Sequence, residues 1–262
     1  MVFFLNYIIS VGYTYCLGRY YANRKLSNGA LFLVLFPVFF LWLYICGGQY
    51  EVGTDYGSYL SIFNGYDLDT YLDKREYLFV GIVSLFNACG LHGQILFYVF
   101  YAINFLFFFL IIKRFPIKLT FLFIILYIAV TSLFNNQLNT LRQATAVYIG
   151  TYVAILILEK RYWKSFWFIW IAAFVHQSAL VLFLLYSFNS IINKLSYKFL
   201  LVGLIVAIGL SLVLTTDLLD FALSFLSDEY AWYLKGGMVA ETGLLTKITK
   251  YIFIPVYLLS WW

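Results

Sequence analysis

Residues 94–112 read QILFYVFYAINFLFFFLII, a run of nineteen side chains that contains no charge. A helix of this length reaches about 28 Å at ~1.5 Å per residue, which is close to the roughly 30 Å hydrocarbon core of a bilayer. A helix on the surface of a soluble protein needs a polar face, and this stretch has none. The stretch therefore predicts a membrane-spanning helix.

Similar apolar runs recur along the whole chain. Of its 262 residues, 64% are hydrophobic, 23% are aromatic and only 11% are charged, whereas a soluble domain has about 25% charged residues. We therefore expect an all-α, polytopic membrane helical bundle with about eight to nine spans, forming one transmembrane domain over residues 1–262. The apolar segments fall at 2–17, 30–46, 77–91, 94–112, 119–134, 143–158, 165–188, 199–214 and 248–262.

The net charge of +5 does not indicate nucleic-acid binding, because the basic residues are scattered singly through short loops. The three cysteines lack metal-ligand spacing, and their odd number argues against a disulfide framework. We interpret them as small packing residues; they are Cys16, Cys46 and Cys89.

Charge counting predicts the orientation of the segments. The first run lacks a cleavage site and precedes Arg19, Arg24 and Lys25, so we expect a retained anchor that starts outside. If every segment crosses the membrane, 6 basic residues lie inside and 11 outside. Segment 77–91 is short, about 22 Å as a helix, and an interfacial or re-entrant placement changes the count to 12 inside and 5 outside. The positive-inside rule favours that second arrangement.

Segment 165–188 has two interpretations. The first is one span with His176 near its middle. The second is a hairpin that turns at His176, and this hairpin gives 11 basic residues inside and 6 outside. The hairpin is favoured because it places the acidic loop 215–247 outside, although carboxylates influence topology little. The extracytoplasmic face then gathers the loops 47–76, 134–143 and 215–247 and the turn at His176. The last loop contains an amphipathic stretch, 217–237, expected to lie along the membrane surface.

The stretch FNNQLNTLRQATAVYIG, residues 134–150, places Arg142 at the start of an apolar segment. A guanidinium keeps its charge, and burying it without a partner costs several kcal/mol. Arg142 either snorkels to the interface or holds an anion, for which a phosphate and the helix N-terminus are well suited. Its position on the outer side, where the positive-inside rule disfavours arginine, raises the weight of the second interpretation. Asn139 and Gln143 beside it suggest a polar, sugar-binding entrance to a cavity.

Three further residues are candidates for chemistry. Asp55 lies in the glycine-rich turn GGQYEVGTDYGSYL, residues 47–60, and is either a general base or a solvated loop aspartate. His176 is the titratable group of a long apolar run, and either carries a proton or contacts diphosphate, or is a neutral histidine bonded to a neighbouring helix. Glu76 opens segment 77–91, where the helix dipole alone would stabilise a carboxylate.

These pieces together resemble the EpsG-like family of bacterial polysaccharide polymerases, which is grouped with the Wzy-type O-antigen polymerases. The motifs that carry the resemblance span residues 40–190 in the family's order. They are VGTDYGSYL (52–60), Glu76 before a short segment, LNTLRQATA (138–146) and AFVHQSALVLF (173–183).

The resemblance implies an enzyme that joins polyprenyl-diphosphate-linked oligosaccharide repeat units on the extracytoplasmic face of the bacterial inner membrane. It implies O-antigen or exopolysaccharide synthesis, no cofactor, no metal, and a flippase and a chain-length regulator as partners. Family members usually have further spans, so this chain is either a short member or an incomplete one. The catalytic residues are then expected to be Asp55 as the base, Arg142 on the diphosphate and His176 as a second donor. The substrate-binding residues are expected to be Tyr56, Glu76, Asn139, Gln143, Gln177, Tyr230 and Tyr233.

Two other functions are compatible with a hydrophobic helical membrane protein. A flippase or other transporter of lipid-linked oligosaccharide needs a polar path across the bundle, and the spans carry almost no charged residues. A membrane O-acyltransferase acting on surface sugars would use a histidine base and a cytoplasmic acyl donor, and it would place His176 on the cytoplasmic side.

Overall fold

The computed structural model describes residues 2–53, 55–129 and 133–186. All of them belong to the first of two units, 1–194 and 195–262, into which the chain divides, and the description below concerns that unit alone. The expected segments 199–214 and 248–262, the amphipathic stretch 217–237, Tyr230 and Tyr233 lie outside the described residues.

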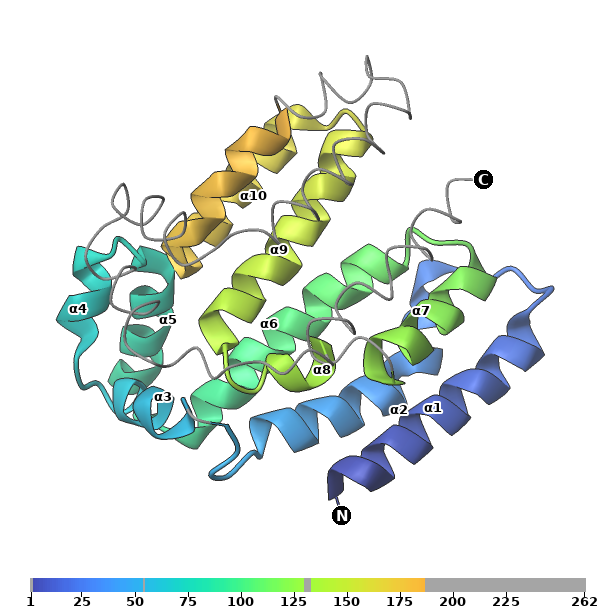
Figure 1. Cartoon of the computed structure of the whole chain (residues 1–262), viewed down its shortest axis with the longest axis horizontal. Coiled ribbons are helices and arrows are strands. Elements are labelled where there is room, and N and C mark those ends of the chain that lie inside the picture. Colours follow the sequence, from blue (N-terminus) through green and yellow to red (C-terminus); the bar gives the residue numbers. More distant parts are fainter. Residues whose placement is uncertain (1, 54, 130–132, 187–262) are drawn as a thin grey trace, which may run out of the picture. The chain divides into compact units, whose positions relative to one another are not determined.

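The described residues form helices and contain no strand, as expected for an all-α fold. Figure 1 labels them in chain order. Their bounds are α1 Val2–Tyr21, α2 Asn28–Gly47, α3 Tyr56–Phe63, α4 Leu68–Asp73, α5 Tyr77–Ala88, α6 Gln94–Ile112, α7 Ile117–Ala129, α8 Leu133–Asn136, α9 Leu141–Leu158, α10 Tyr162–Val175 and the 3₁₀ helix η1 Gln177–Phe183.

Three of these helices are long and apolar enough to cross a membrane: α2, α6 and α9. Helices α5 and α7 are apolar but shorter, with 12 and 13 residues, so each reaches only about 20 Å or less. The expectation of eight to nine spans is therefore not confirmed in the described part of the chain. The apolar run expected at 119–134 contains α7 and the start of α8, and residues 130–132 between them lie outside the described residues.

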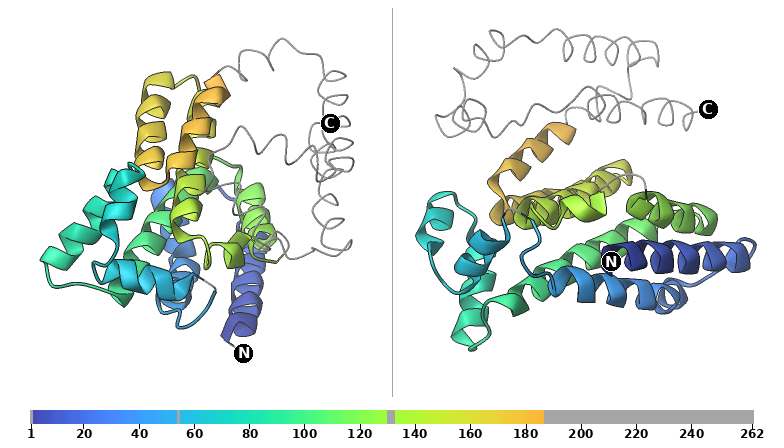
Figure 2. Two further views of the ribbon diagram at one scale, coloured as in Figure 1. Left: turned by 60° about the vertical axis from the view of Figure 1, so that its left-hand side comes forward. Right: turned by 60° about the horizontal axis from the view of Figure 1, so that its bottom comes forward.

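The long helices pack side by side in the order α7, α1, α2, α6, α9 and α10, as the two views in Figure 2 also show. A few polar side chains connect α1 to α2 within an otherwise apolar contact. The indole Nε1 of Trp42 donates to Ser10 Oγ at 2.9 Å, and Ser10 Oγ donates to Asn6 Oδ1 at 3.0 Å. Such bonds hold helices together in lipid, where apolar contact alone supplies no preference for one neighbour.

Aromatic rings fill the core between α2, α6 and α7. Trp42 is fully buried and lies against Phe105, Phe108, Tyr127 and Phe134, with ring centroids 5.2–5.7 Å apart. These tilted and edge-to-face contacts add about 0.5–1.5 kcal/mol each to the packing. The core thus fixes the lateral positions of α2, α6 and α7, and α9 packs against α6.

The end of α2 and the start of α6 are fixed to each other. Gln94, the first residue of α6, donates from Nε2 to the carbonyl oxygens of Gly47 and Gln49, which satisfies acceptors that a helix terminus leaves unpaired. The helices meet closely here, because a Cβ on Gly47 would lie only 2.3 Å from the Tyr98 ring. This junction positions the loop 48–55 that follows.

The chain reverses at His176. His176 has an extended backbone (φ −153°, ψ 117°) that ends α10, and η1 then runs back along α10. Tyr186 reaches the start of α10, where its hydroxyl donates to the Tyr162 carbonyl at 3.1 Å and bonds Ser165 Oγ at 2.6 Å. Of the two interpretations of segment 165–188, the described residues therefore show the hairpin.

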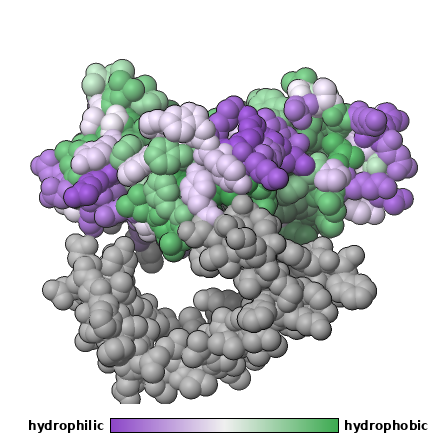
Figure 3. All heavy atoms as spheres, turned by 90° about the horizontal axis from the view of Figure 1, so that it is seen from above, coloured by the Kyte–Doolittle hydropathy of each residue, from purple (hydrophilic) through white to green (hydrophobic). Residues whose placement is uncertain are grey.

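Charges separate between the two ends of the long helices. At the end where α2 finishes and α6 and α9 begin lie six of the seven carboxylates in residues 2–186; we call it the acidic end. The opposite end, which we call the basic end, holds nine of the twelve Lys and Arg residues of that range. Figure 3 shows hydrophilic patches on the surface with hydrophobic surface between them. The nine are Arg19, Arg24, Lys25, Lys113, Arg114, Lys118, Lys160, Arg161 and Lys164.

Gly53 controls how the loop 48–55 meets the loop before α9. Its φ is +86°, and a Cβ there would lie 1.9 Å from Asn139 Oδ1. We expect Gly53→Ala to destabilise the protein by more than 1 kcal/mol, because side chains rarely adopt this backbone region. Gly57→Ala is the matched control, since a Cβ at Gly57 meets nothing within 4 Å and alanine favours its helix. The measurement is the apparent melting temperature in detergent, and an equal response of the two variants would contradict the assignment.

Candidate functional site

Three segments that are far apart in the sequence meet at the acidic end. They are the residue before α5, the first turn of α9 and the break after α10, which contribute Glu76, Arg142 and His176. The short helix α5 contacts α10, and α9 packs against α10 along its length. Helix α10 runs from the basic end to the acidic end and so brings His176 to the point where α5 starts.

The Glu76 carboxylate binds both Arg142 and His176. Arg142 Nη1 donates to Oε2 in an ion pair, and His176 Nδ1 lies 2.8 Å from Oε1. The Glu76 side chain is 1% exposed, against 17% for Arg142 and 24% for His176. Glu76 precedes α5, and its side chain makes no capping bond to that helix. Its role is to connect α5 to α9 and to the hairpin.

Aromatic rings surround the guanidinium of Arg142. Its Cζ lies 4.3 Å from the centroid of Tyr71, 5.2 Å from Phe79 and 5.9 Å from Tyr59, and cation–π contacts contribute about 0.5–2 kcal/mol each where water is excluded. The Tyr59 hydroxyl also accepts from the Arg142 backbone N–H at 3.4 Å. Of the two interpretations of Arg142, the structure shows an inward-facing guanidinium rather than a snorkelling one.

The electrostatics of the cluster follow from this geometry. Burial opposes ionisation of Glu76, but the hydrogen bond from His176 and the charge of Arg142 outweigh it and lower the pKa of Glu76 below 4.5. Burial raises the pKa of Tyr59, which the negative charge of Asp55 raises further, while Arg142 opposes both. Glu76 is therefore an anion at neutral pH.

The cluster keeps unused hydrogen-bonding capacity. Arg142 carries five N–H donors, and its buried Nε has no hydrogen-bond partner among the described residues. A histidine whose Nδ1–H points at a carboxylate leaves Nε2 as an acceptor. The arrangement can thus bind an anion beside Arg142 and accept a proton at His176.

The other predicted site residues lie in varied surroundings. Asp55 precedes α3 and is half-buried, with its charge acting on Tyr59. Tyr56 is buried, stacks on Phe97 at 5.3 Å and donates to Gln94 Oε1 at 2.9 Å. Asn139 lies against Gly53. Gln143 and Gln177 are exposed, each directly after a member of the cluster.

Sequence reasoning missed Tyr59, Tyr71 and Phe79, the rings around Arg142. With 24 tyrosines and 28 phenylalanines in the chain, no aromatic residue stands out by type. The spacing of Glu76 and Phe79 is a usable signal, because residues three apart share one face of a helix. Among the described residues, no group of three or more His, Cys, Asp or Glu side chains is arranged to hold a metal ion.

The cluster predicts a characteristic pattern of stability. Glu76→Gln should destabilise the protein by about 3–5 kcal/mol, since it leaves the charge of Arg142 buried without a counter-ion. The double variant Glu76→Gln/Arg142→Met should recover most of this loss, because replacing a buried pair as a unit is nearly neutral.

The matched control is Glu159→Gln at the basic end. Glu159 pairs with Arg114, but both side chains are about 30% exposed, so the loss should stay below ~1 kcal/mol. Apparent melting temperatures in detergent measure all three variants. Equal effects of Glu76→Gln and Glu159→Gln would show that the Glu76 pair is not a buried one.

Comparison with known proteins gives the family of the chain. We detect no similarity to a curated protein and none to a solved structure. The model of the EpsG family, a family of Wzy-like membrane polysaccharide polymerases, matches residues 2–262. That match includes every residue of the cluster and nearly the whole chain, so the chain belongs to the EpsG family.

Proposed function

We propose that the chain joins polyprenyl-diphosphate-linked repeat units, as donor and acceptor, on the extracytoplasmic face of the bacterial inner membrane. The family makes it a membrane polysaccharide polymerase in general terms. The observation that carries the finer proposal is the Arg142–Glu76–His176 cluster, which combines a cation for a leaving diphosphate with a group that can take a proton.

The distribution of charge supports the extracytoplasmic placement. The cluster lies at the acidic end, and nine of the twelve basic residues of the range 2–186 lie at the other end. Because basic residues near the ends of spans favour the cytoplasm, the basic end is assigned to the cytoplasm. This placement also disfavours the O-acyltransferase alternative, which needs His176 on the cytoplasmic side.

The proposed reaction exchanges one C–O bond for another. The bond between the anomeric carbon of the donor chain and the lipid diphosphate breaks, and the acceptor hydroxyl oxygen forms a bond to that carbon. The diphosphate leaves with the electron pair, and Arg142 offsets its charge together with the N-terminus of α9, whose N-cap Thr140 makes no side-chain capping bond. We infer that these fixed charges suffice without a metal ion.

The acceptor hydroxyl must lose its proton to a base. His176 is our candidate, because Glu76 orients its ring through Nδ1 and so leaves Nε2 to accept the proton. This assignment replaces Asp55, which the sequence alone favoured and which we now place in acceptor-sugar binding near Tyr59. Glu76, with 1% of its side chain exposed, acts as a positioning residue rather than a substrate contact.

The cation role is tested by chain growth. Purified full-length protein supplied with lipid-linked repeat units should form longer chains, and the double variant Glu76→Gln/Arg142→Met should lose growth by at least ~100-fold while melting near the wild-type temperature. An oxyanion-stabilising group is worth about 10²–10³-fold. Normal growth by the double variant would refute the role given to Arg142.

The base assignment is tested in the same assay. His176→Gln should lower the turnover number about 10²–10⁴-fold. Asp55→Asn should mainly raise the KM for the acceptor. His92→Gln is the control, since His92 is exposed in the loop before α6. If Asp55→Asn instead lowers the turnover number by this factor and His176→Gln does not, Asp55 is the base.

A further inference from the structure

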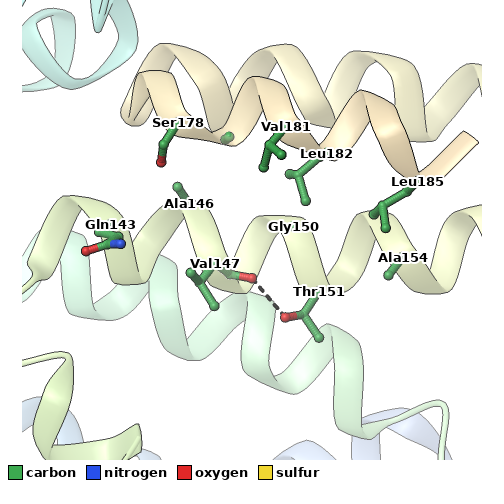
Figure 4. Close-up of a pocket in the computed structure, with 11 residues that line it drawn as sticks. Gln143, Ala146, Val147, Gly150, Thr151, Ala154, Ser178, Val181, Leu182 and Leu185 are labelled. Carbon is green, nitrogen blue, oxygen red and sulfur yellow. Dashed lines mark hydrogen bonds between the residues drawn. The ribbon is translucent and has the colours of Figure 1, made fainter. Parts of the chain in front are cut away.

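A groove runs along α9 next to the cluster. It lies between α9 and the η1 arm of the hairpin and has a volume of about 370 Å³ (Figure 4). Its α9 side carries Ala146, Gly150 and Ala154, which are four residues apart and therefore share one helix face. Its η1 side carries Val181, Leu182 and Leu185.

The small residues of α9 create the space. Ala146 and Ala154 end at Cβ, and a Cβ on Gly150 would lie 3.0 Å from Leu182 Cδ1. Larger side chains on this face would therefore fill the groove or push η1 away. From Gln143 to Ala154 the groove follows α9 for about 16 Å, which is half the thickness of a hydrocarbon core.

The free polar groups of the groove lie near the cluster, because the hydroxyl of Thr151 farther along donates to the Val147 carbonyl of its own helix. Gln143 and Ser178 lie at one end, and the aliphatic side chains extend from there toward Ala154 and Leu185 (Figure 4). Gln143 follows Arg142 directly, and Ser178 is two residues after His176. Adjacent helical residues point about 100° apart, so Arg142 faces α5 while Gln143 faces the groove, and one headgroup at the start of α9 can contact both.

The groove and the cluster together fit one amphipathic anion. We propose that the groove between α9 and η1 binds the polyprenyl chain of the donor lipid whose diphosphate lies against Arg142. The argument is charge complementarity along a continuous surface: a cation and polar groups at the acidic end, then an aliphatic channel along a candidate span. This proposal rests on the proposed function, and it adds the subsite that holds the lipid tail.

Binding measurements in nanodiscs test the tail subsite. The probes are a long-chain polyprenyl diphosphate, geranyl diphosphate and inorganic diphosphate, each titrated against full-length protein. Wild-type protein should bind the long-chain probe at least about tenfold tighter than the geranyl probe. Ala154→Leu should remove most of this difference and leave the affinity for inorganic diphosphate unchanged, because it fills the groove far from Arg142. Ala154→Ser should behave as wild type.

The matched control is Ala102→Leu. It makes the same change on an exposed face of α6, another candidate span, outside the groove. Equal long-chain affinity in Ala154→Leu and Ala102→Leu overturns the proposal, and is the result expected if a phospholipid acyl chain fills the groove. A change of oligomeric state in Ala154→Leu with unchanged affinity also overturns it, in favour of contact with a second copy.

The headgroup and tail assignments fail separately in this design. If Glu76→Gln/Arg142→Met binds inorganic diphosphate as well as wild type does, the headgroup role of Arg142 is wrong, and with it the leaving-group mechanism of the proposed function. The comparison of Ala154→Leu with Ala102→Leu still decides the tail subsite in that case. A loss of long-chain affinity in Ala154→Leu alone, with the same melting temperature as wild type, establishes the groove as the tail site.

Discussion

The site depends on one buried carboxylate that holds an arginine and a histidine side chain. Glu76 is almost fully buried and accepts from Arg142 and His176 on its two oxygens. An arginine near the end of a membrane span costs several kcal/mol unless an anion meets it, and an unpaired carboxylate at this depth would be equally unfavourable. Each charge is tolerated because the other is present, so the three segments that carry them must meet.

Two departures from regular spans make that meeting possible. Helix α5 has only 12 residues, so its start stays at the acidic end with Glu76. Helix α10 runs from the basic end and stops at Val175, so His176 lies at the acidic end beside Glu76. The extended backbone of His176 then turns the chain back along α10.

The sequence predicted the positions of the helices better than the contacts between them. The apolar run 94–112 coincides with α6, and segment 77–91 was recognised as too short to span. Composition and length decide such features locally. The pairing of Glu76 with Arg142, 66 residues later, depends on how helices pack, and no local pattern encodes it. The aromatic rings around Arg142 could not be predicted from the sequence either, because aromatic residues are spread over the entire chain.

The ion pair also bears on how an anionic substrate could bind. An arginine that already neutralises a carboxylate has lost part of its attraction for a diphosphate, so Glu76 weakens ground-state binding. In return, the guanidinium is held between rings and cannot relax away as charge develops on the leaving group. Preorganised charge of this kind stabilises a transition state more than a bound substrate. The buried pair therefore favours turnover over tight retention of the lipid diphosphate, which suits an enzyme that must release this product after every addition.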